Sequence, residues 1–369
     1  MTRFARGKTI VRSVVVLAAL VAMHGSAGQP VAVPSDKAEI ARLLALGGEG
    51  FRIRGSDRFL IASDGDDSVV NAVAERLEGA YQAVARFRDG LQLPIHPPPR
   101  RLPVLLFSRH ASFEQYARTV GFDDPITPGF YHSPSNTAAF CNVLDLPNVR
   151  EISQRIEQAE ARRDPPPTDK RITEWRAQRD ALVETFNRLV VQHEAAHQVL
   201  FNIGVLLRGA DNPDWLVEGL ACQFEVPLRD ADRTRANPMR LADFRDALGT
   251  APGAIDIDEQ SLRDSHSKGR VLPLVDLVGG AELRTPDESG RTYRYAQAWA
   301  LVDYLHRTRG EAFAAYLRRI AGRPPNERTD RQHRITEFQS VFGPLDQAFE
   351  RLWIESVLKL PFDPRQTGR

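Results

Sequence analysis

The segment 190–202, VVQHEAAHQVLFN, places two histidines and a glutamate within an otherwise apolar stretch. His193 and His197 continue a stripe of residues spaced three and four apart, which is typical of the buried face of a helix; its other members are Leu182, Phe186, Leu189, Ala196 and Leu200. Two imidazoles one helical turn apart can each direct a nitrogen at one metal ion. The pattern HExxH therefore predicts a metal site, with Glu194 beside the open position of the metal.

A catalytic zinc site uses a third protein ligand and leaves one position open for water. The metzincin continuation HExxHxxGxxH is excluded, because Leu200 and Ile203 occupy the positions of its glycine and its last histidine. A second helix is expected in NPDWLVEGLACQFE, residues 212–225, with Asn212 as its N-cap. Glu218 shares the inward face of this helix with Trp215, Cys222 and Glu225, and it is the predicted third ligand. A solvent-facing acid on the helix surface is the alternative interpretation of Glu218.

These residues together suggest hydrolysis by an activated water. Zinc lowers the pKa of water that it binds to about 7, and Glu194 can accept the proton and pass it to a leaving amine. The oxyanion that develops needs a hydrogen-bond donor, for which we select Tyr295, at the start of an expected helix and on a different face from Tyr293. A tyrosine buried only for packing is the alternative. His132, in GFYHSPSN, is expected in a surface turn, although it could line the substrate site.

HEAAH followed by WLVEGLACQFE resembles the gluzincin branch of zinc metallopeptidases, the thermolysin and aminopeptidase relatives. The closest resemblance is to peptidase-MA-like domain families of unknown function, with the pattern HExxH and then W-x-x-EG-x-A. It is specific at residues 193–225 and extends loosely over residues 50–320, including YRYAQAWALVDYL. The resemblance implies a zincin-like metallopeptidase fold, one Zn²⁺ ion on His193, His197 and Glu218, and Glu194 as the general base. Thermolysin relatives carry an aspartate where this chain has Cys222, so the resemblance does not identify the residue that orients the ligand histidines.

The strands and helices that the sequence predicts around this site indicate an α+β fold. A strand hairpin at 51–65, a helix at 68–91, a strand at 102–107, a helix at 112–121 and a strand pair at 129–144 follow from alternating and period-3.6 patterns. A long helix is expected over 172–203, and helices dominate beyond 215. The strand at 137–143 is a candidate for pairing with an extended substrate.

The chain is therefore divided into a mixed α/β part at 51–235, which holds the metal site, and a mostly helical part at 236–369. Residues 147–181 form a charged helical insertion in the first part, interrupted by the prolines of RRDPPPTDK. The insertion is interpreted as a solvated element without a role in binding.

The N-terminus predicts export. Residues 1–27 combine four basic residues, a ten-residue apolar run at 14–23 and small residues near 27, the pattern of a signal peptide, and residues 28–50 form a lead-in segment. The apolar run is too short for a transmembrane helix, which needs about 20 residues, although retention as an anchor stays open. The mature protein is thus expected to be periplasmic or secreted, without an integral membrane span. Whether Cys141 and Cys222 pair is left open.

The composition of the chain limits the classes of partner. With 369 residues, 42% hydrophobic and 26% charged, the chain can bury a core. Its net charge of +1 gives no overall field for nucleic acid, so we expect a peptide or protein substrate and predict no oligomeric state. The leading hypothesis is an exported zinc metallopeptidase. The alternatives are a non-catalytic zincin-like metal-binding or cell-envelope interaction protein and a helical binding protein with a chance motif.

Overall fold

The computed structural model of the chain describes residues 36–94, 96–122, 127–161, 170–226, 236–251, 253–285, 287–325 and 327–363. The predicted signal peptide at 1–27 lies outside these residues. The segment predicted as a lead-in contains helix α1 (Asp36–Gly47), which packs against the sheet and buries Leu43. Within the described part of the chain, no helix combines the length and apolar character that crossing a bilayer requires.

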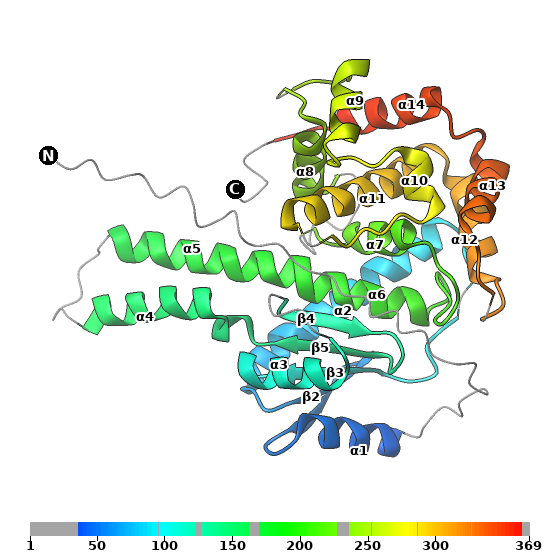
Figure 1. The fold of residues 1–369 in the computed structure, drawn as a ribbon. Coiled ribbons are helices and arrows are strands. Elements are labelled where there is room, and N and C mark those ends of the chain that lie inside the picture. The colour runs from blue at the N-terminus through cyan, green and yellow to red at the C-terminus, as the bar shows by residue number, and fades with distance from the viewer. Residues whose placement is uncertain are drawn as a thin grey trace, which may run out of the picture.

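The fold is α+β, as predicted, with a five-stranded mixed sheet near the N-terminus (Figure 1). The sheet has the order β1-β2-β3-β5-β4, and its strands are β1 (Arg52–Gly55), β2 (Phe59–Ser63), β3 (Leu102–Phe107), β4 (Gly129–His132) and β5 (Thr137–Cys141). Both predicted hairpins, β1–β2 and β4–β5, are confirmed as antiparallel pairs. Strands β2, β3 and β5 are parallel, and their continuous apolar runs are buried on both faces.

The prediction that residues 137–143 pair with a substrate is wrong. Strand β5 hydrogen-bonds to β3 on one side and to β4 on the other, so its backbone groups are already used. Strand β4 lies at the edge of the described sheet and next to the helix that carries the histidines. The sequence signal failed because a buried apolar strand has the same composition whether it is central or close to an edge.

Helices cover both faces of this sheet. On one face, Phe130 of β4 stacks on Tyr116 of α3 (His110–Thr119), and α1 also packs there. On the other face, Tyr131 stacks on Phe201 of α6 (His193–Asn202), and Phe59 contacts Tyr81 of α2 (Asp67–Gly90). The histidine helix is therefore held between the sheet and the helical part of the chain.

The long helix predicted over 172–203 forms, but its geometry changes before the histidines. Helix α5 (Lys170–Phe186) continues through a π-helical segment, Asn187–Gln192, into α6. The segment holds one extra residue per turn, and such segments recur at functional sites. Helices α4 (Pro147–Ala161) and α5 pack as a hairpin that extends away from the sheet (Figure 1), while the predicted proline interruption at 162–169 lies outside the described residues.

The C-terminal half is helical, as predicted. Its helices are α7 (Asp214–Cys222), α8 (Pro238–Leu248), α9 (Glu259–Ser267), α10 (Leu274–Gly279), α11 (Glu288–Thr308), α12 (Gly310–Ala321), α13 (Arg331–Phe342) and α14 (Gln347–Leu358). Helix α7 starts one residue later than predicted, after Pro213 rather than Asn212. One hydrophobic cluster runs from Leu43 to Leu358, so the two predicted parts share a core.

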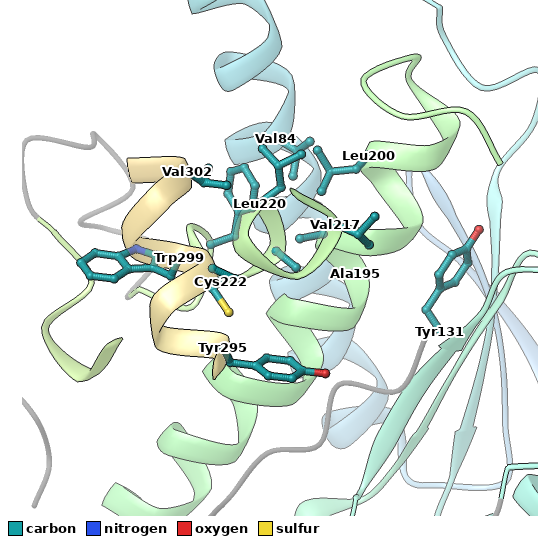
Figure 2. Packing of buried hydrophobic residues seen from close by; sticks show 14 of the residues in the cluster. Val84, Tyr131, Ala195, Leu200, Val217, Leu220, Cys222, Tyr295, Trp299 and Val302 are labelled. Atoms are coloured by element: carbon teal, nitrogen blue, oxygen red, sulfur yellow. The ribbon is translucent and has the colours of Figure 1, made fainter. Parts of the chain in front are cut away.

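Helix α7, which carries Glu218, packs closely against α11 (Figure 2). A Cβ atom at Gly219 would lie 2.4 Å from the backbone oxygen of Ala298 and 2.7 Å from a methyl group of Val302. Only glycine allows this approach, so the residue after Glu218 fixes how near α7 lies to α11.

Candidate metal centre

The structure brings His193, His197 and Glu218 together. The two Nε2 atoms are 2.9 Å apart, and Oε2 of Glu218 lies 3.2 Å from Nε2 of His193 and 3.3 Å from Nε2 of His197. Both imidazoles are fully buried, and Glu218 is 5% exposed. Helix α6 supplies the histidines from successive turns and α7 supplies the carboxylate, as the sequence predicted.

The chemistry of these atoms fits a divalent cation. Nδ1 of His193 lies 2.8 Å from Oε1 of Glu225, and since a carboxylate only accepts, Nδ1 carries the hydrogen of the neutral ring. In this neutral tautomer, Nε2 of His193 carries a lone pair, which faces Nε2 of His197 and Oε2 of Glu218. Tetrahedral zinc ligands at 2.0–2.2 Å stand about 3.3–3.5 Å apart, close to the observed separations. His193, His197 and Glu218 could therefore hold one zinc ion.

Glu225 is the orienting residue that sequence analysis did not identify. It is fully buried, and Arg240 of α8 donates two hydrogen bonds of 2.7 Å to its oxygens. The amide of Asn237 donates a third, at 3.1 Å. Burial opposes ionisation of Glu225, but the charge of Arg240 and the bond to His193 lower its pKa to about 2. The sequence placed Glu225 on the inward face of the same helix as Glu218, but α7 ends at Cys222, so Glu225 reaches His193 from the segment that follows the helix.

Gln192 connects the histidine helix to this orienting carboxylate. Its amide nitrogen donates to the backbone oxygens of Phe224 and Val226, at 2.9 and 2.8 Å, on both sides of Glu225. Its amide oxygen accepts from Arg76 of α2 at 3.1 Å. The last residue of the π-helical segment therefore fixes the backbone that presents Glu225 to His193.

Glu194 lies on the side of α6 that faces the sheet. Its Oε2 accepts a 2.8 Å hydrogen bond from the backbone N–H of Tyr131 in the edge strand β4, while Oε1 has no hydrogen-bond partner among the described residues. Burial, together with the charge of Glu218, raises the pKa of Glu194 to about 8, against the opposing effect of His193. The carboxyl group is thus anchored by one oxygen and presents the other.

Tyr295 projects from α11 toward the histidines. Its ring centroid lies 6.4 Å from that of His193, and Figure 2 shows its hydroxyl pointing past α6 toward the side of the molecule that carries Tyr131. The helix begins at Glu288, so the expectation that Tyr295 starts it is wrong. Tyr293 points elsewhere and donates to Asp246 at 2.6 Å. His132 contacts Ser135 within the β4–β5 turn and is half-buried.

Arg284 is a second residue that sequence analysis missed. It lies between α10 and α11, is half-buried, and is hydrogen-bonded to Tyr295. Burial lowers the pKa of its guanidinium, but Tyr295, Glu218 and Glu194 raise it above the ordinary value. No sequence signal marks it, because it lies in a loop 66 residues after Glu218 without a motif of its own.

The two cysteines are both buried and neither forms a disulfide, which answers the question left open by the sequence. Cys222 lies beside His193 and Glu225, in the position that holds an aspartate in thermolysin relatives, and burial raises the pKa of its thiol. These three groups also lie within ligand distance of one another. Arg240 already neutralises that side of the cluster through Glu225, so His193, His197 and Glu218 are the better candidate for holding a cation.

Residues 188–327 match the model of a family described as a protein of unknown function, DUF1570. No match to the chain was found among curated proteins or among solved structures. The matched segment contains the candidate ligands as well as Glu194, Arg284 and Tyr295.

Proposed function

We propose that this protein is a zinc-dependent metallopeptidase of the gluzincin type with a zincin-like fold. The observation that carries the proposal is the convergence of three buried lone-pair donors, from His193, His197 and Glu218, within 2.9–3.3 Å of one another. Such a group is costly to bury unless a cation binds it. Glu194, which lies on the same helix as the two histidines, adds a buried carboxyl group next to them.

When bound, zinc would supply Lewis-acid chemistry, polarising a carbonyl group and lowering the pKa of water. Glu194 would accept a proton from the attacking water through Oε1 and donate it to the leaving amine. The hydrogen bond from Tyr131 holds Oε2 meanwhile, so that the carboxyl group does not rotate away. The Tyr295 hydroxyl would donate to the carbonyl oxygen as negative charge develops on it.

A peptide is the substrate class that fits the surroundings of Glu194. Strand β4, whose Tyr131 N–H is used by Glu194, is an edge strand of the described sheet, and an extended chain can add to the other main-chain groups of such an edge. The overall net charge of only +1 gives no support for nucleic acid. The pattern of residues 1–27 supports export, so the proposed substrates are peptides or proteins of the periplasm or the exterior.

Metal analysis and a paired variant test the proposal. The purified protein is expected to contain one zinc ion per chain, to lose it on His197→Ala, and to keep it on Glu194→Gln. A mixed peptide library, followed by mass spectrometry, is expected to be cleaved by the wild type and not by Glu194→Gln. Protein without bound metal would favour a helical protein with a chance motif, and metal without cleavage would favour a non-catalytic metal-binding protein.

A further inference from the structure

Three polar residues of helix α6, Glu194, Gln198 and Asn202, are spaced four apart and bind the same β-hairpin. Residues at this spacing lie above one another on one side of a helix. Glu194 accepts from the backbone N–H of Tyr131 in β4, and the other two bind Asn136 in the turn between β4 and β5. One side of the histidine helix thus makes three polar contacts with the hairpin, and the proposed mechanism uses only that of Glu194.

The contact between Asn136 and Asn202 is a reciprocal amide pair. Nδ2 of Asn136 donates to Oδ1 of Asn202 at 2.9 Å, and Nδ2 of Asn202 donates to Oδ1 of Asn136 at 2.7 Å. Nδ2 of Asn202 also donates to the backbone oxygen of Gln198 at 2.6 Å, which holds this amide against its own helix. Asn136 has a φ of 56°, a left-handed conformation that asparagine tolerates better than most residues with a side chain. The pair therefore joins an amide fixed on the hairpin to an amide fixed on the helix.

Gln198 connects this amide pair to the sheet. Its Nε2 donates to the backbone oxygens of Asn136 and of Pro103 in β3, both at 2.9 Å, whereas its Oε1 has no hydrogen-bond partner among the described residues. The side chain is fully buried, and a buried amide with one end unpaired is costly. The contribution of Gln198 therefore lies in its two donated hydrogen bonds, which connect α6 to β3 and to the β4–β5 turn.

The same turn also holds Tyr131, whose N–H anchors Glu194. The Tyr131 hydroxyl donates to Oδ1 of Asn136 at 2.8 Å, and its ring stacks on Phe201 alongside α6 (Figure 2). Tyr131 is thus held by its backbone at Glu194 and by its side chain at Asn136.

We infer that Asn136, Gln198 and Asn202 are positioning residues, a polar clamp that keeps the Tyr131 N–H in the place from which it fixes Oε2 of Glu194. This inference rests on the proposed function, because it assigns the clamp a role in placing the general base. A base must stay within hydrogen-bond reach of the water that it activates, and a misplacement of about 1 Å can lower the rate about a hundredfold. The clamp binds the hairpin and its own helix rather than the atoms of the three candidate ligands, so we expect it to act on the base without changing the metal site.

Hydrogen exchange at the Tyr131 amide tests the clamp without relying on turnover. The chain has seven tyrosines, so ¹⁵N-tyrosine labelling of the full-length protein gives few amide signals in an NMR spectrum, and Tyr131→Phe identifies the signal of Tyr131. Asn136→Gly removes the clamp amide at a φ that glycine adopts freely. We expect this variant to speed exchange at Tyr131 about tenfold or more, toward the rate in Glu194→Ala, which removes the acceptor itself.

Two comparisons separate positioning from a loss of global stability. A globally less stable protein would also exchange faster at the amides of Tyr304 in α11 and Tyr316 in α12, whereas the clamp predicts a change confined to Tyr131. Asn142→Gly is the matched control, because Asn142 is also half-buried but lies at the other end of β5, where its side chain accepts from the backbone N–H of Leu144. This control is expected to exchange at Tyr131 like the wild type.

Kinetics and metal binding extend the test to the proposed reaction. On a peptide that the mixed library shows to be cleaved, Asn136→Gly is expected to lower kcat about ten- to hundredfold and to leave KM within about twofold. Its zinc affinity is expected to stay close to that of the wild type. Asn136→Asp keeps the oxygen that accepts from Tyr131 and Asn202, and it is expected to restore most of kcat.

Unchanged exchange at Tyr131 in Asn136→Gly, or exchange that rises equally at Tyr304 and Tyr316, would overturn the inference while leaving the proposed function intact. A kcat equal to that of the wild type despite faster exchange would overturn it as well. Asn202→Ala removes the amide pair from the helix side and carries the same predictions if Asn136→Gly does not fold. A wild type that binds no zinc would overturn the proposed function itself, and with it the catalytic role of the clamp.

Discussion

Replacing Glu225 by glutamine tests whether the orienting carboxylate sustains both the metal site and the fold. The substitution keeps the size of the side chain but removes the charge that balances Arg240, which donates two 2.7 Å hydrogen bonds to it in the core. Loss of one partner of a buried ion pair costs about 3–5 kcal/mol, a large part of a typical stability of about 5–15 kcal/mol. Loss of the carboxylate behind a ligand histidine weakens metal affinity by about 10–100-fold.

Two measurements separate these effects. Urea unfolding in the presence of a chelator gives the stability, and competition with a chromophoric chelator gives the zinc affinity. Glu355→Gln is the matched control, because Glu355 pairs with Arg351 on the partly exposed surface of α14 and such pairs contribute about 0–1 kcal/mol.

The double variant Glu225→Gln, Arg240→Met identifies the source of the lost stability. Removing the unpaired guanidinium is expected to restore part of the stability, since a buried pair replaced by neutral groups costs little. Zinc affinity is expected to stay low, because the partner of His193 is still a neutral amide. Zinc affinity in Glu225→Gln within twofold of the wild type would refute the role of Glu225 at His193.

Three further predictions follow from the contacts of the site. Gly219→Ala places a methyl group 2.4 Å from the Ala298 oxygen and is expected to lower the free energy of unfolding in urea by about 1–3 kcal/mol, whereas Gly310→Ala, which meets no atom within 4 Å, is expected to leave it nearly unchanged. The folded pKa of Glu194, about 8 against 4.5, means that the folded metal-free chain keeps a proton that the unfolded chain releases, so stability falls by up to about 1.4 kcal/mol per pH unit from pH 4.5 to 8. Glu194→Gln is expected to flatten this dependence in chelator-treated protein, and an equally steep curve for the variant would contradict the burial of an ionisable group there. Gln192→Met leaves two backbone oxygens beside Glu225 without their donor and is expected to cost about 1–3 kcal/mol and to weaken zinc binding; unchanged zinc affinity would show that Glu225 keeps its position without this contact.

The sequence predicted those parts of the site that depend on local periodicity. His193 and His197 lie one turn apart on an apolar stripe, so any helix through them places both rings on one side. Glu218 could be added because its own helix has an apolar face that must be buried, and burial turns the carboxylate inward. The strands could be predicted in the same way, from the alternation of apolar and polar residues and from the turn residues at 133–136.

The remaining parts depend on how distant elements meet, which periodicity does not specify. Arg240 is paired with Glu225 only because the start of α8, a helix that packs on α11, returns to the end of α7, and Arg284 acts on Tyr295 from a loop. The edge position of β4 follows from the strand order of the sheet, and the order is set by two crossover connections. The π-helical segment also escaped prediction, because a helix with one inserted residue leaves nearly the same spacing of apolar residues.

The cost of burying the polar cluster links the proposed metal to the stability of the fold. Each buried polar group without a partner costs roughly 1–3 kcal/mol. On α6, Nδ1 of His197 and Oε1 of Glu194 have no hydrogen-bond partner among the described residues. Glu225 and Arg240 stabilise only the far side of His193, so the proposed cation would act on the near side, where the His193, His197 and Glu218 atoms converge. A ligand that binds only the folded chain adds RT ln(1 + [L]/Kd), about 4.1 kcal/mol at a thousandfold excess over Kd. The residues that would perform the chemistry are thus a weak point of the metal-free core, and zinc binding would compensate for that weakness.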